Sequence, residues 1–403
     1  MKFTDQPFLP VILGGDITAF SLARSFHEEY DVRCIVISLA KNGITSYSKF
    51  IDNRFEPQME KLDVFIDTLQ KIGTEYADKK IILLACGDWY VRMIVENRDE
   101  FGPNYVIPYI SLELLDRLVL KDSFYEICEE TGVPYPRTYI HDVKEDKLPE
   151  LPFDYPVVAK PASSALYHFA DFPGKRKIFI MQNEKQLTEM LSNLKKSSYD
   201  YKFLIQDFIP GDDTNMRILT CYCDRNSDVR FAAFGRTLLE DHGPMAIGNP
   251  LAIINETDAE ITEHAARLLK HVGYTGFANF DLKYDSRDGS LRFFEINARL
   301  GRSNYYITGS GFNAVRWIVE DLIYGNDLPY TVADKKSLYT VVPKSSILDY
   351  VKDEALREEV NTLYREQKVA NPLRYKGDKG IIHRLYYWLF LYRQGKKYRQ
   401  YKD

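Results

Sequence analysis

Cysteine is scarce in this chain of 403 residues, and the five that occur follow no recognisable pattern. Their number is odd and their spacing irregular, so neither a disulfide framework nor a tetrahedral metal site is expected. We expect all five thiols to be reduced and mostly buried, as in a reducing cytosol. They are Cys34, Cys86, Cys128, Cys221 and Cys223.

Long apolar runs and a strong basic excess are also missing. No stretch of about 18 apolar residues occurs, so no membrane-spanning helix is expected. The first residues lack a basic segment followed by an apolar one, which argues against a signal peptide and favours a cytoplasmic protein. The formal net charge is −5, so the chain as a whole gives no reason to expect a nucleic-acid partner.

The dinucleotide-binding fingerprint G-x-G-x-x-G is absent from the place where it would be expected. Residues 8–14 predict a buried strand, residues 17–30 a helix and residues 32–38 a second strand, which is the start of a parallel sheet. The intervening Gly14-Gly15-Asp16 is better explained as a tight turn than as a nucleotide site. With a further apolar strand at 81–85, this part predicts a Rossmann-like α/β unit.

The rest of the chain alternates between helical and strand patterns, without an internal repeat. Apolar residues at helical spacing predict helices, and short apolar or alternating runs that end at turn residues predict strands. We expect helices at 112–132, 184–196, 256–272 and 311–324, and strands at 157–161, 203–209, 215–223, 229–238, 276–284 and 291–297.

A predicted hairpin around Asp288-Gly289 carries the clearest chemistry. Glu295 and Asn297 are two residues apart on one strand, so they share a face. Folding at the turn brings Asp281 roughly opposite Glu295. Three oxygen ligands then converge, and Mg²⁺ prefers such ligands, with water and phosphate oxygens in its other positions. A polar strand edge with a salt bridge explains the same residues.

Basic residues at other places suggest contacts with phosphate. Lys160 ends an apolar strand, where a charge is costly to bury without an anion. That anion can be a phosphate or an internal carboxylate. Lys121 opens a helical segment, where a solvated lysine is the simpler explanation. Arg299 continues on the face of the metal strand and Arg302 follows, and both could stabilise developing negative charge.

The strand containing Gln206, Asp207, Phe208 and Ile209 stops at a Pro-Gly pair and has acidic residues just beyond it. Its backbone groups are suited to the edge of an adenine, and an acid after it to ribose hydroxyls. An ordinary transition from a strand to a turn explains the pattern as well.

Along the chain, Lys121, Lys160, the strand at Gln206–Ile209 and the hairpin around Asp288-Gly289 follow one another. Together these four features resemble the ATP-grasp superfamily over roughly residues 110–330. The resemblance implies that Lys121 and Lys160 contact the phosphates of ATP. It also implies that residues 162–177 form a lid over them, with Lys175 or Lys177 reaching in. The segment Gln206–Ile209 would then hold adenine through its backbone groups.

The resemblance also implies roles for the residues beyond the adenine segment. Asp213 would bind ribose. Mg²⁺, usually two ions and with Mn²⁺ as a tolerated substitute, would lie on Asp281, Glu295 and Asn297. Arg299 would stabilise the transferring phosphoryl group, so that Lys160, Arg299 and Arg302 are the candidate catalytic residues.

Three departures from the superfamily pattern concern details of this site. Gln206 stands where Glu is frequent, so the backbone is the expected adenine contact. Ala298 replaces the proline that often follows the metal-binding Asn. The lid is bulkier than a glycine-rich one, because it contains Tyr167, His168, Phe169 and Phe172.

The predicted fold class is therefore α/β, with a Rossmann-like N-terminal domain before an ATP-grasp fold of two α+β subdomains. We expect the first domain at residues 1–115 and the ATP-grasp domain at 116–330. The latter divides into a small lid subdomain at about 135–210 and a larger metal-binding subdomain at about 211–330. A C-terminal extension covers residues 331–403.

This class activates a carboxylate with ATP as an acyl phosphate, which an amine then attacks, so both a small-molecule carboxylate and an amine acceptor are expected partners. Residues 11–26 and Gly301–Tyr306 resemble the D-aspartate ligase group, which joins an amino acid to a lysine amine of a peptidoglycan precursor. Arg302, Ser303 and the turn Gly309–Asn313 are candidates for holding the carboxylate, although the turn could simply cap a helix. A dipeptide-type ligase and a non-catalytic nucleotide-binding protein remain alternatives, and a homo-oligomer is compatible with all three.

The tail changes character, because residues 374–403 contain nine Lys or Arg against two Asp, a net charge of +7. Aromatic and aliphatic residues lie among these charges. Such a tail suits peripheral contact with an anionic membrane through residues 380–403. A C-terminal helix that packs on the body of the protein is the other interpretation.

Overall fold

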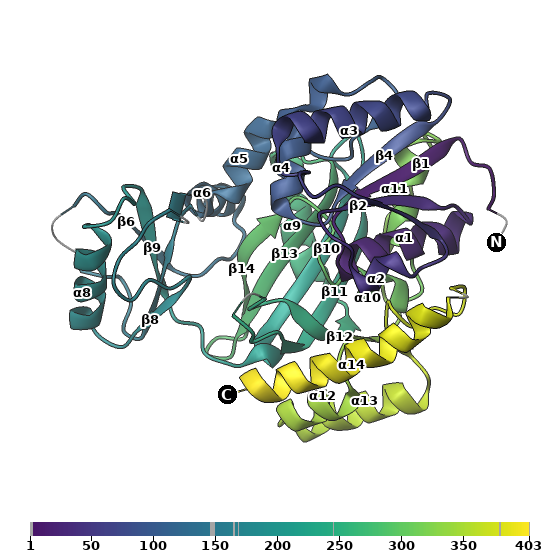
Figure 1. Cartoon of the computed structure of the whole chain (residues 1–403). Coiled ribbons are helices and arrows are strands. Elements are labelled where there is room, and N and C mark those ends of the chain that lie inside the picture. The colour runs from purple at the N-terminus through teal and green to yellow at the C-terminus, as the bar shows by residue number, and fades with distance from the viewer. Residues whose placement is uncertain are drawn as a thin grey trace. The chain divides into compact units, whose positions relative to one another are not determined.

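The computed structural model describes residues 3–145, 150–163, 166–167, 169–244, 246–378 and 380–402. The chain forms two compact units (Figure 1). Unit 1 contains residues 1–112, 213–279 and 297–403, and unit 2 contains residues 113–212 and 280–296. The two units do not coincide with the three domains expected from the sequence, and the division into three domains stays a prediction.

Unit 1 begins with a parallel five-stranded sheet of order β3-β2-β1-β4-β5. The strand β1 (Phe8–Leu13) is entirely buried between β2 (Cys34–Ser38) and β4 (Lys80–Ala85). Strands covered on both faces are continuously apolar, which is why these runs could be predicted. The Rossmann-like prediction is confirmed. The other elements here are α1 (Ile17–Tyr30), α2 (Gly43–Ser46), β3 (Ile51–Phe55), α3 (Leu62–Glu75), α4 (Asp88–Glu96), η1 (Arg98–Glu100) and β5 (Tyr105–Val106).

The turn between β1 and α1 confirms the tight-turn interpretation. Asp16 caps α1, because its carboxylate accepts hydrogen bonds from the amides of Thr18 and Ala19 at 3.0 and 3.4 Å. Gly14 has a φ of +129°, and a Cβ at this position would lie 2.7 Å from Cβ of Cys86. Only glycine therefore lets the ends of β1 and β4 approach this closely.

A larger mixed sheet has the order β14-β13-β10-β11-β12-β16-β17, with β15 paired to β11. Its core is formed by apolar residues of β10, β11 and β12 together with the helices α10 and α11. The bounds are η2 (Asp213–Asn215), β10 (Met216–Cys223), β11 (Val229–Glu240), β12 (Pro250–Glu256), α9 (Ala259–His271), β13 (Gly276–Asp285), β14 (Ser290–Asn297), α10 (Tyr305–Gly309), α11 (Ala314–Leu322), β15 (Thr331–Val332), β16 (Leu338–Thr340) and β17 (Val369–Ala370).

Unit 2 contains a four-stranded sheet of order β6-β9-β7-β8 with α8 packed on one face (Figure 1). The bounds are α5 (Leu112–Val119), α6 (Lys121–Thr131), β6 (Thr138–Asp142), β7 (Val157–Pro161), β8 (Phe179–Met181), α8 (Glu184–Leu194) and β9 (Lys202–Asp207). The single helix expected at 112–132 is wrong, because Leu120 is extended and separates α5 from α6. Lys121 is consequently the first residue of α6.

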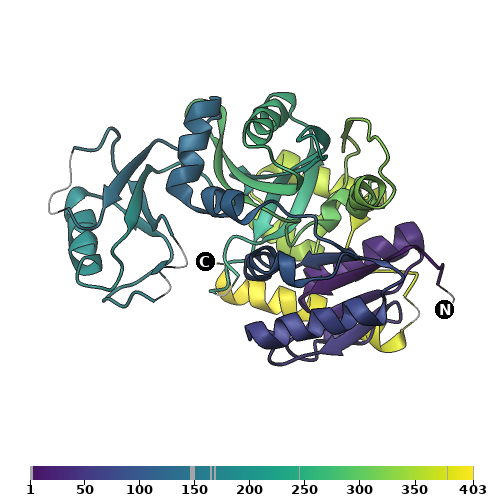
Figure 2. The same cartoon turned by 90° about the horizontal axis from the view of Figure 1, so that it is seen from above.

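The C-terminal part of unit 1 is helical. It consists of α12 (Lys344–Tyr350), α13 (Glu354–Arg365) and the long α14 (Ile381–Tyr401), which runs beside the other two (Figures 1 and 2). Within the described ranges, no helix combines the length and the apolar character that crossing a bilayer requires.

Candidate functional site

Two lysines predicted to contact phosphate lie in unit 2 on neighbouring elements. Lys160 is in β7, where it pairs with Leu204 of β9, and its side chain is only 9% exposed. Lys121 begins α6, where its amide donates to the carbonyl of Ala162 at 3.4 Å, just after β7. The start of α6 is thus attached to the end of β7, which brings the two ammonium groups into one neighbourhood.

The groups in direct contact with the Lys160 ammonium are neutral. It donates to the Tyr125 hydroxyl at 3.3 Å and lies 5.3 Å from the ring centre of Phe294. Burial, with the charges of Lys121 and Lys177 added to it, lowers the pKa of Lys160 to about 7, although Glu295 opposes the shift. Among the described residues, no carboxylate lies within ion-pairing distance of this ammonium. Such an environment favours a bound anion.

The Tyr125 hydroxyl and Gln206 form the scaffold behind this lysine. Tyr125 donates to the carbonyl of Phe294 at 2.9 Å and is also hydrogen-bonded to Gln206. The Gln206 amide in turn donates to the Thr138 hydroxyl at 2.7 Å. Because Gln206 pairs with Val158, it shares the sheet face of Lys160. Gln206 therefore supports the lysine with its side chain, a contribution that the sequence did not reveal.

The hairpin brings Asp281 and Glu295 together, as its geometry predicts, and the two side chains are hydrogen-bonded. Glu295 also lies 3.6 Å from the Lys121 ammonium. The Glu295 side chain is 42% exposed; its partial burial raises its pKa, but the charges of Lys121, Lys160 and Lys177 outweigh this and lower it. Glu295 is thus held as a carboxylate among three cations.

The expected lid is described in part, because Ser164, Ala165 and His168 lie outside the described residues. Lys177 contributes its charge to the surroundings of Lys160 and Glu295. Lys175 instead donates to the carbonyl of Ala170 within its own loop. The structure therefore distinguishes two lysines between which the sequence could not choose.

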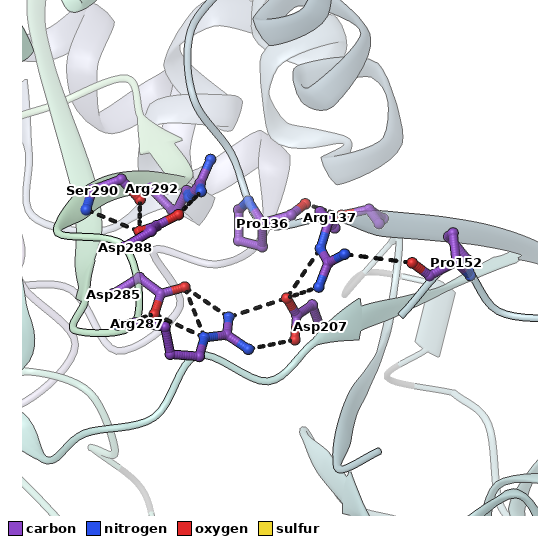
Figure 3. A network of polar contacts seen from close by, with 10 residues as sticks. Pro136, Arg137, Pro152, Asp207, Asp285, Arg287, Asp288, Ser290 and Arg292 are labelled. Carbon is purple, nitrogen blue, oxygen red and sulfur yellow. Dashed lines mark hydrogen bonds and ion pairs between the residues drawn. The ribbon is translucent and has the colours of Figure 1, made fainter. Parts of the chain in front are cut away.

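The segment Gln206–Ile209 ends β9, and its Asp207 belongs to the polar network in Figure 3. The carboxylate of Asp207 contacts Arg137 at 2.8 Å and Arg287 at 3.0 Å. Arg287 also contacts Asp285, at 2.7 Å. Burial raises the pKa of Asp207, but both arginines hold it below its usual value. The Asp207 side chain is occupied, which agrees with an adenine contact through the backbone alone.

Asp213 lies in unit 1, at the start of η2. Its carboxylate accepts the amide of Glu240 at 2.8 Å and contacts Nε2 of His242 at 2.9 Å. Its own amide lies 3.3 Å from the Tyr350 hydroxyl. The carboxylate thus fixes the end of β11, and its predicted contact with ribose stays a prediction.

Asn297 is the last residue of β14 and belongs to unit 1, as do the two candidate arginines. Arg299 forms a two-pronged contact with Asp88, with both distances at 2.8 Å. Arg302 lies 3.8 Å from Asp16. Asp16 follows β1 and Asp88 begins the helix after β4, so both arginines meet the carboxyl ends of neighbouring parallel strands, a common location of ligand sites.

The candidates for carboxylate binding after Arg302 differ in their surroundings. Ser303 is 1% exposed, and its hydroxyl has no hydrogen-bond partner among the described residues. Asn313 caps α11 by accepting the amide of Val315 and donates to the carbonyl of Ser25. The turn at 309–313 therefore serves as the helix cap that was the alternative interpretation, whereas Ser303 keeps unused hydrogen-bonding capacity beside Arg302.

Sequence reasoning missed Tyr125, Asp16 and Asp88 as members of these clusters. Asp16 was noted only as a turn residue. Tyr125 is one of 29 tyrosines, so nothing in the sequence singles it out. Asp88 directly follows an apolar strand and a glycine, a position that could have been noticed. Its partner Arg299 is 211 residues away, so the pairing itself required the fold.

Four of the five cysteines are buried, in agreement with the prediction, and Cys86 is partly exposed. Among the described residues, three or more carboxylates, imidazoles or thiolates do not gather as a metal site. The expected Mg²⁺ set has two carboxylates and one amide, so phosphate oxygens and water would have to provide the remaining ligands.

A Rossmann-like sheet, a sheet that carries the buried Lys160 and a hairpin with two adjacent carboxylates together define the class of ATP-grasp ligases. Residues 246–311 match the family "Carbamoyl-phosphate synthase L chain, ATP binding domain". The fold resembles an L-amino acid ligase from Bacillus licheniformis, with a TM-score of 0.55, 15% identity, and coverage of 79% of this chain and 74% of that one.

A second similar structure is the biotin carboxylase domain of Hydrogenobacter thermophilus 2-oxoglutarate carboxylase, in complex with magnesium ADP and bicarbonate. The TM-score is 0.59 at 16% identity, with coverage of 83% of this chain and 74% of that one. D-aspartate ligase from Enterococcus faecium (strain Aus0004) is 37% identical over 391 residues, which are 94% of this chain and 92% of that protein. The chain belongs to the D-aspartate ligase family and is an ATP-dependent carboxylate–amine ligase.

Proposed function

We propose that this ligase activates D-aspartate, or a closely similar amino acid, and transfers it to the lysine side-chain amine of a peptidoglycan precursor in the cytoplasm. The ATP-dependent activation in this proposal rests on the buried Lys160, whose direct contacts are neutral and which lies near two further lysines. The substrate is supported by the 37% identity to D-aspartate ligase.

The proposed phosphate site consists of Lys121, Lys160 and Lys177. A transferring phosphoryl group needs positioning and neutralisation of charge more than covalent assistance. Three cations near two carboxylates leave a local positive excess, which suits a polyphosphate. A carboxylate oxygen of the substrate attacks the γ-phosphorus, the bond to ADP breaks, and an acyl phosphate forms. The acceptor amine then attacks the acyl carbon, loses a proton and displaces phosphate.

The close approach of Asp281 and Glu295 fits a divalent cation. Two carboxylates side by side repel each other unless a proton or a cation lies between them. Asp281, Glu295 and Asn297 would hold Mg²⁺, which supplies charge neutralisation for the phosphates when it is bound. Mn²⁺ would serve through the same oxygen ligands. The remaining proposed nucleotide contacts are the Gln206–Ile209 backbone for adenine and Asp213 for ribose.

The proposed amino-acid site is the cluster of charged residues in unit 1. Aspartate carries two carboxylates and one ammonium group, so it needs both cationic and anionic partners. Arg302 offers a cation and Asp16, 3.8 Å from it, an anion, whereas Arg299 is already closely paired with Asp88. The unpartnered hydroxyl of the buried Ser303 provides a further donor. A guanidinium recognises a carboxylate through paired hydrogen bonds, which gives geometric specificity.

The test is a phosphate-release screen with ATP and Mg²⁺ over D-aspartate, L-aspartate, D-glutamate and D-alanine. Each acid is offered with and without a lysine-containing peptidoglycan precursor. We expect release that requires D-aspartate and the precursor together. We expect Glu295→Gln to abolish release while the circular dichroism spectrum is unchanged, and Asp5→Asn, at an exposed site, to serve as the control.

Other outcomes of the screen would favour the alternatives. Release from two free amino acids without the precursor would identify a dipeptide-type ligase. No release of phosphate from any pair, with nucleotide still bound, would identify a non-catalytic nucleotide-binding protein. An active Glu295→Gln variant would contradict the metal assignment.

A further inference from the structure

The helix α14 is attached to unit 1 through one face. His383, Phe390 and Tyr398 are buried, at 1%, 6% and 8% exposure. The ring of Tyr386 lies so close to Gly43 of α2 that a Cβ there would be 2.3 Å away. The other face of the helix is consequently directed away from the core, because these contacts fix its rotation.

The outward face carries six large apolar side chains that are 42–74% exposed. At 3.6 residues per turn, these positions fall within an arc of about 120° around the helix. Monomeric proteins rarely expose such a continuous apolar stripe without a function. The residues are Ile381, Ile382, Leu385, Trp388, Leu389 and Tyr392, and we refer to them as the α14 stripe.

The charge of α14 is of one sign. The helix contains five Lys or Arg and no acidic residue. Lys397 lies toward the body of the protein and pairs with the buried Asp241 at 2.7 Å. The other four, which are Arg384, Arg393, Lys396 and Arg399, are exposed, and none of them pairs with a carboxylate of the described part of the chain. An exposed cationic surface thus borders the apolar stripe.

We propose that the α14 stripe inserts into the interfacial region of an anionic lipid bilayer, with Arg384, Arg393, Lys396 and Arg399 contacting its headgroups. A helix with an apolar face bordered by Lys and Arg lies in the plane of such an interface. Trp388 and Tyr392 are the residue types that prefer this depth. The charge complementarity favours a bilayer over a second copy of this chain, whose own cationic border would be repelled.

The surface is independent of the proposed ligase chemistry. No member of the α14 stripe belongs to the lysine cluster or to the carboxylate hairpin. Binding to lipid can therefore be measured without nucleotide or substrate, and a failure here would leave the proposed function untouched. Leu385 and Trp388 are 66% and 67% exposed, so their replacement by polar residues removes little buried contact.

The experiment is co-sedimentation of the full-length protein with phosphatidylcholine vesicles, with and without 30% phosphatidylglycerol. We expect binding only to the anionic vesicles, and a loss of most of it between 0.1 and 0.5 M NaCl. Leu385→Ser/Trp388→Ser should weaken binding at least tenfold. Arg393→Gln/Lys396→Gln should weaken it by a similar factor and reduce its dependence on salt.

Tyr330→Ser is the matched control, because Tyr330 is 54% exposed in the same unit and lies outside α14. It should bind vesicles as the unchanged protein does. Equal binding to both kinds of vesicle, or undiminished binding of Leu385→Ser/Trp388→Ser, would overturn the proposal. Sedimentation velocity that shows a dimer lost in this variant, with no binding to vesicles, would assign the stripe to self-association and overturn it as well.

Discussion

Two polar clusters in unit 2 have three basic side chains each, but they balance their charges in opposite ways. The network of Figure 3 matches Arg137, Arg287 and Arg292 with three aspartates in direct ion pairs of 2.6–3.0 Å. The lysine cluster places Lys121, Lys160 and Lys177 around Glu295 and Asp281, and its direct ion pair, from Lys121 to Glu295, is 3.6 Å long.

The difference separates a structural network from a binding site. A charge that already has its partner gains little from a further ligand, whereas a buried cation without an anion is stabilised by one that arrives. The arginine network is therefore expected to support folding, and the lysine cluster to bind phosphate at some cost to the stability of the free protein. Breaking each cluster separately tests this contrast.

The largest effect is expected for Lys160→Met. Removal of a cation that neutralises phosphate should reduce phosphate release by about 100-fold or more. The free energy of unfolding of the free protein should be unchanged or higher at pH 7, since an uncompensated buried charge is removed. Phosphate release and urea denaturation measure the two quantities.

Lys175→Met is the control for this variant, because Lys175 donates to its own loop at Ala170. It should retain phosphate release within a few-fold. A Lys160→Met protein that is much less stable but fully active would show that Lys160 is a structural residue, and would remove the contrast between the clusters.

A tenfold effect per pH unit is expected for nucleotide affinity. The pKa of Lys160 is lowered to about 7 in the free protein, so most of this side chain is neutral at pH 8. Phosphate binds the protonated form, so ADP should bind with uptake of close to one proton at pH 8, and its Kd should rise about tenfold between pH 8 and 9.

Calorimetry in two buffers with different ionisation enthalpies measures this uptake. Lys160→Met should abolish it, whereas Lys175→Met should not. In the absence of ligand, the lowered pKa of Lys160 decides whether stability rises or falls with pH. The unfolded chain binds the proton of this lysine more tightly between about pH 7 and 10. The stability contribution of Lys160 should therefore rise with pH across that window. A Kd independent of pH would contradict the assignment.

The features that could be predicted from the sequence depend on short-range periodicity. The alternation of a strand places Glu295 and Asn297 on one face, and a turn at Asp288 brings Asp281 beside Glu295. Likewise, Lys160 was noticed because a charge interrupts an apolar strand. In each of these cases, the residues that decide the geometry lie within about 15 positions of one another, so local rules suffice.

The features that could not be predicted depend on distant partners. Arg299 contacts Asp88 and Arg302 contacts Asp16. Both contacts connect segments that precede and follow the expected lid subdomain in the sequence. The position of Asp213 beside His242 depends on how β11 ends. The break at Leu120 has a similar origin, since the amide that follows it donates to Ala162 rather than extending a helix. Tertiary packing decides such positions, and single-residue propensity does not.

The smallest effect, and the sharpest comparison, is expected for Asp207→Asn. Asp207 is 8% exposed, and its two arginines are 60% and 44% exposed, so solvent screens part of the interaction. We expect a loss of about 1 kcal/mol in the free energy of unfolding, measured in urea at pH 7. Because the pKa of Asp207 is lowered in the fold, the loss should disappear as the pH falls and the native carboxylate is protonated. Arg292→Gln, whose carboxylate partner Asp288 is 48% exposed, should change stability by less than about 0.5 kcal/mol. Phosphate release should stay within a few-fold of the unchanged protein in both, since the proposed adenine contact at Asp207 uses the backbone. An Asp207→Asn variant as inactive as Lys160→Met would mean that the two clusters act as one site, and that balanced charge does not by itself mark a structural network.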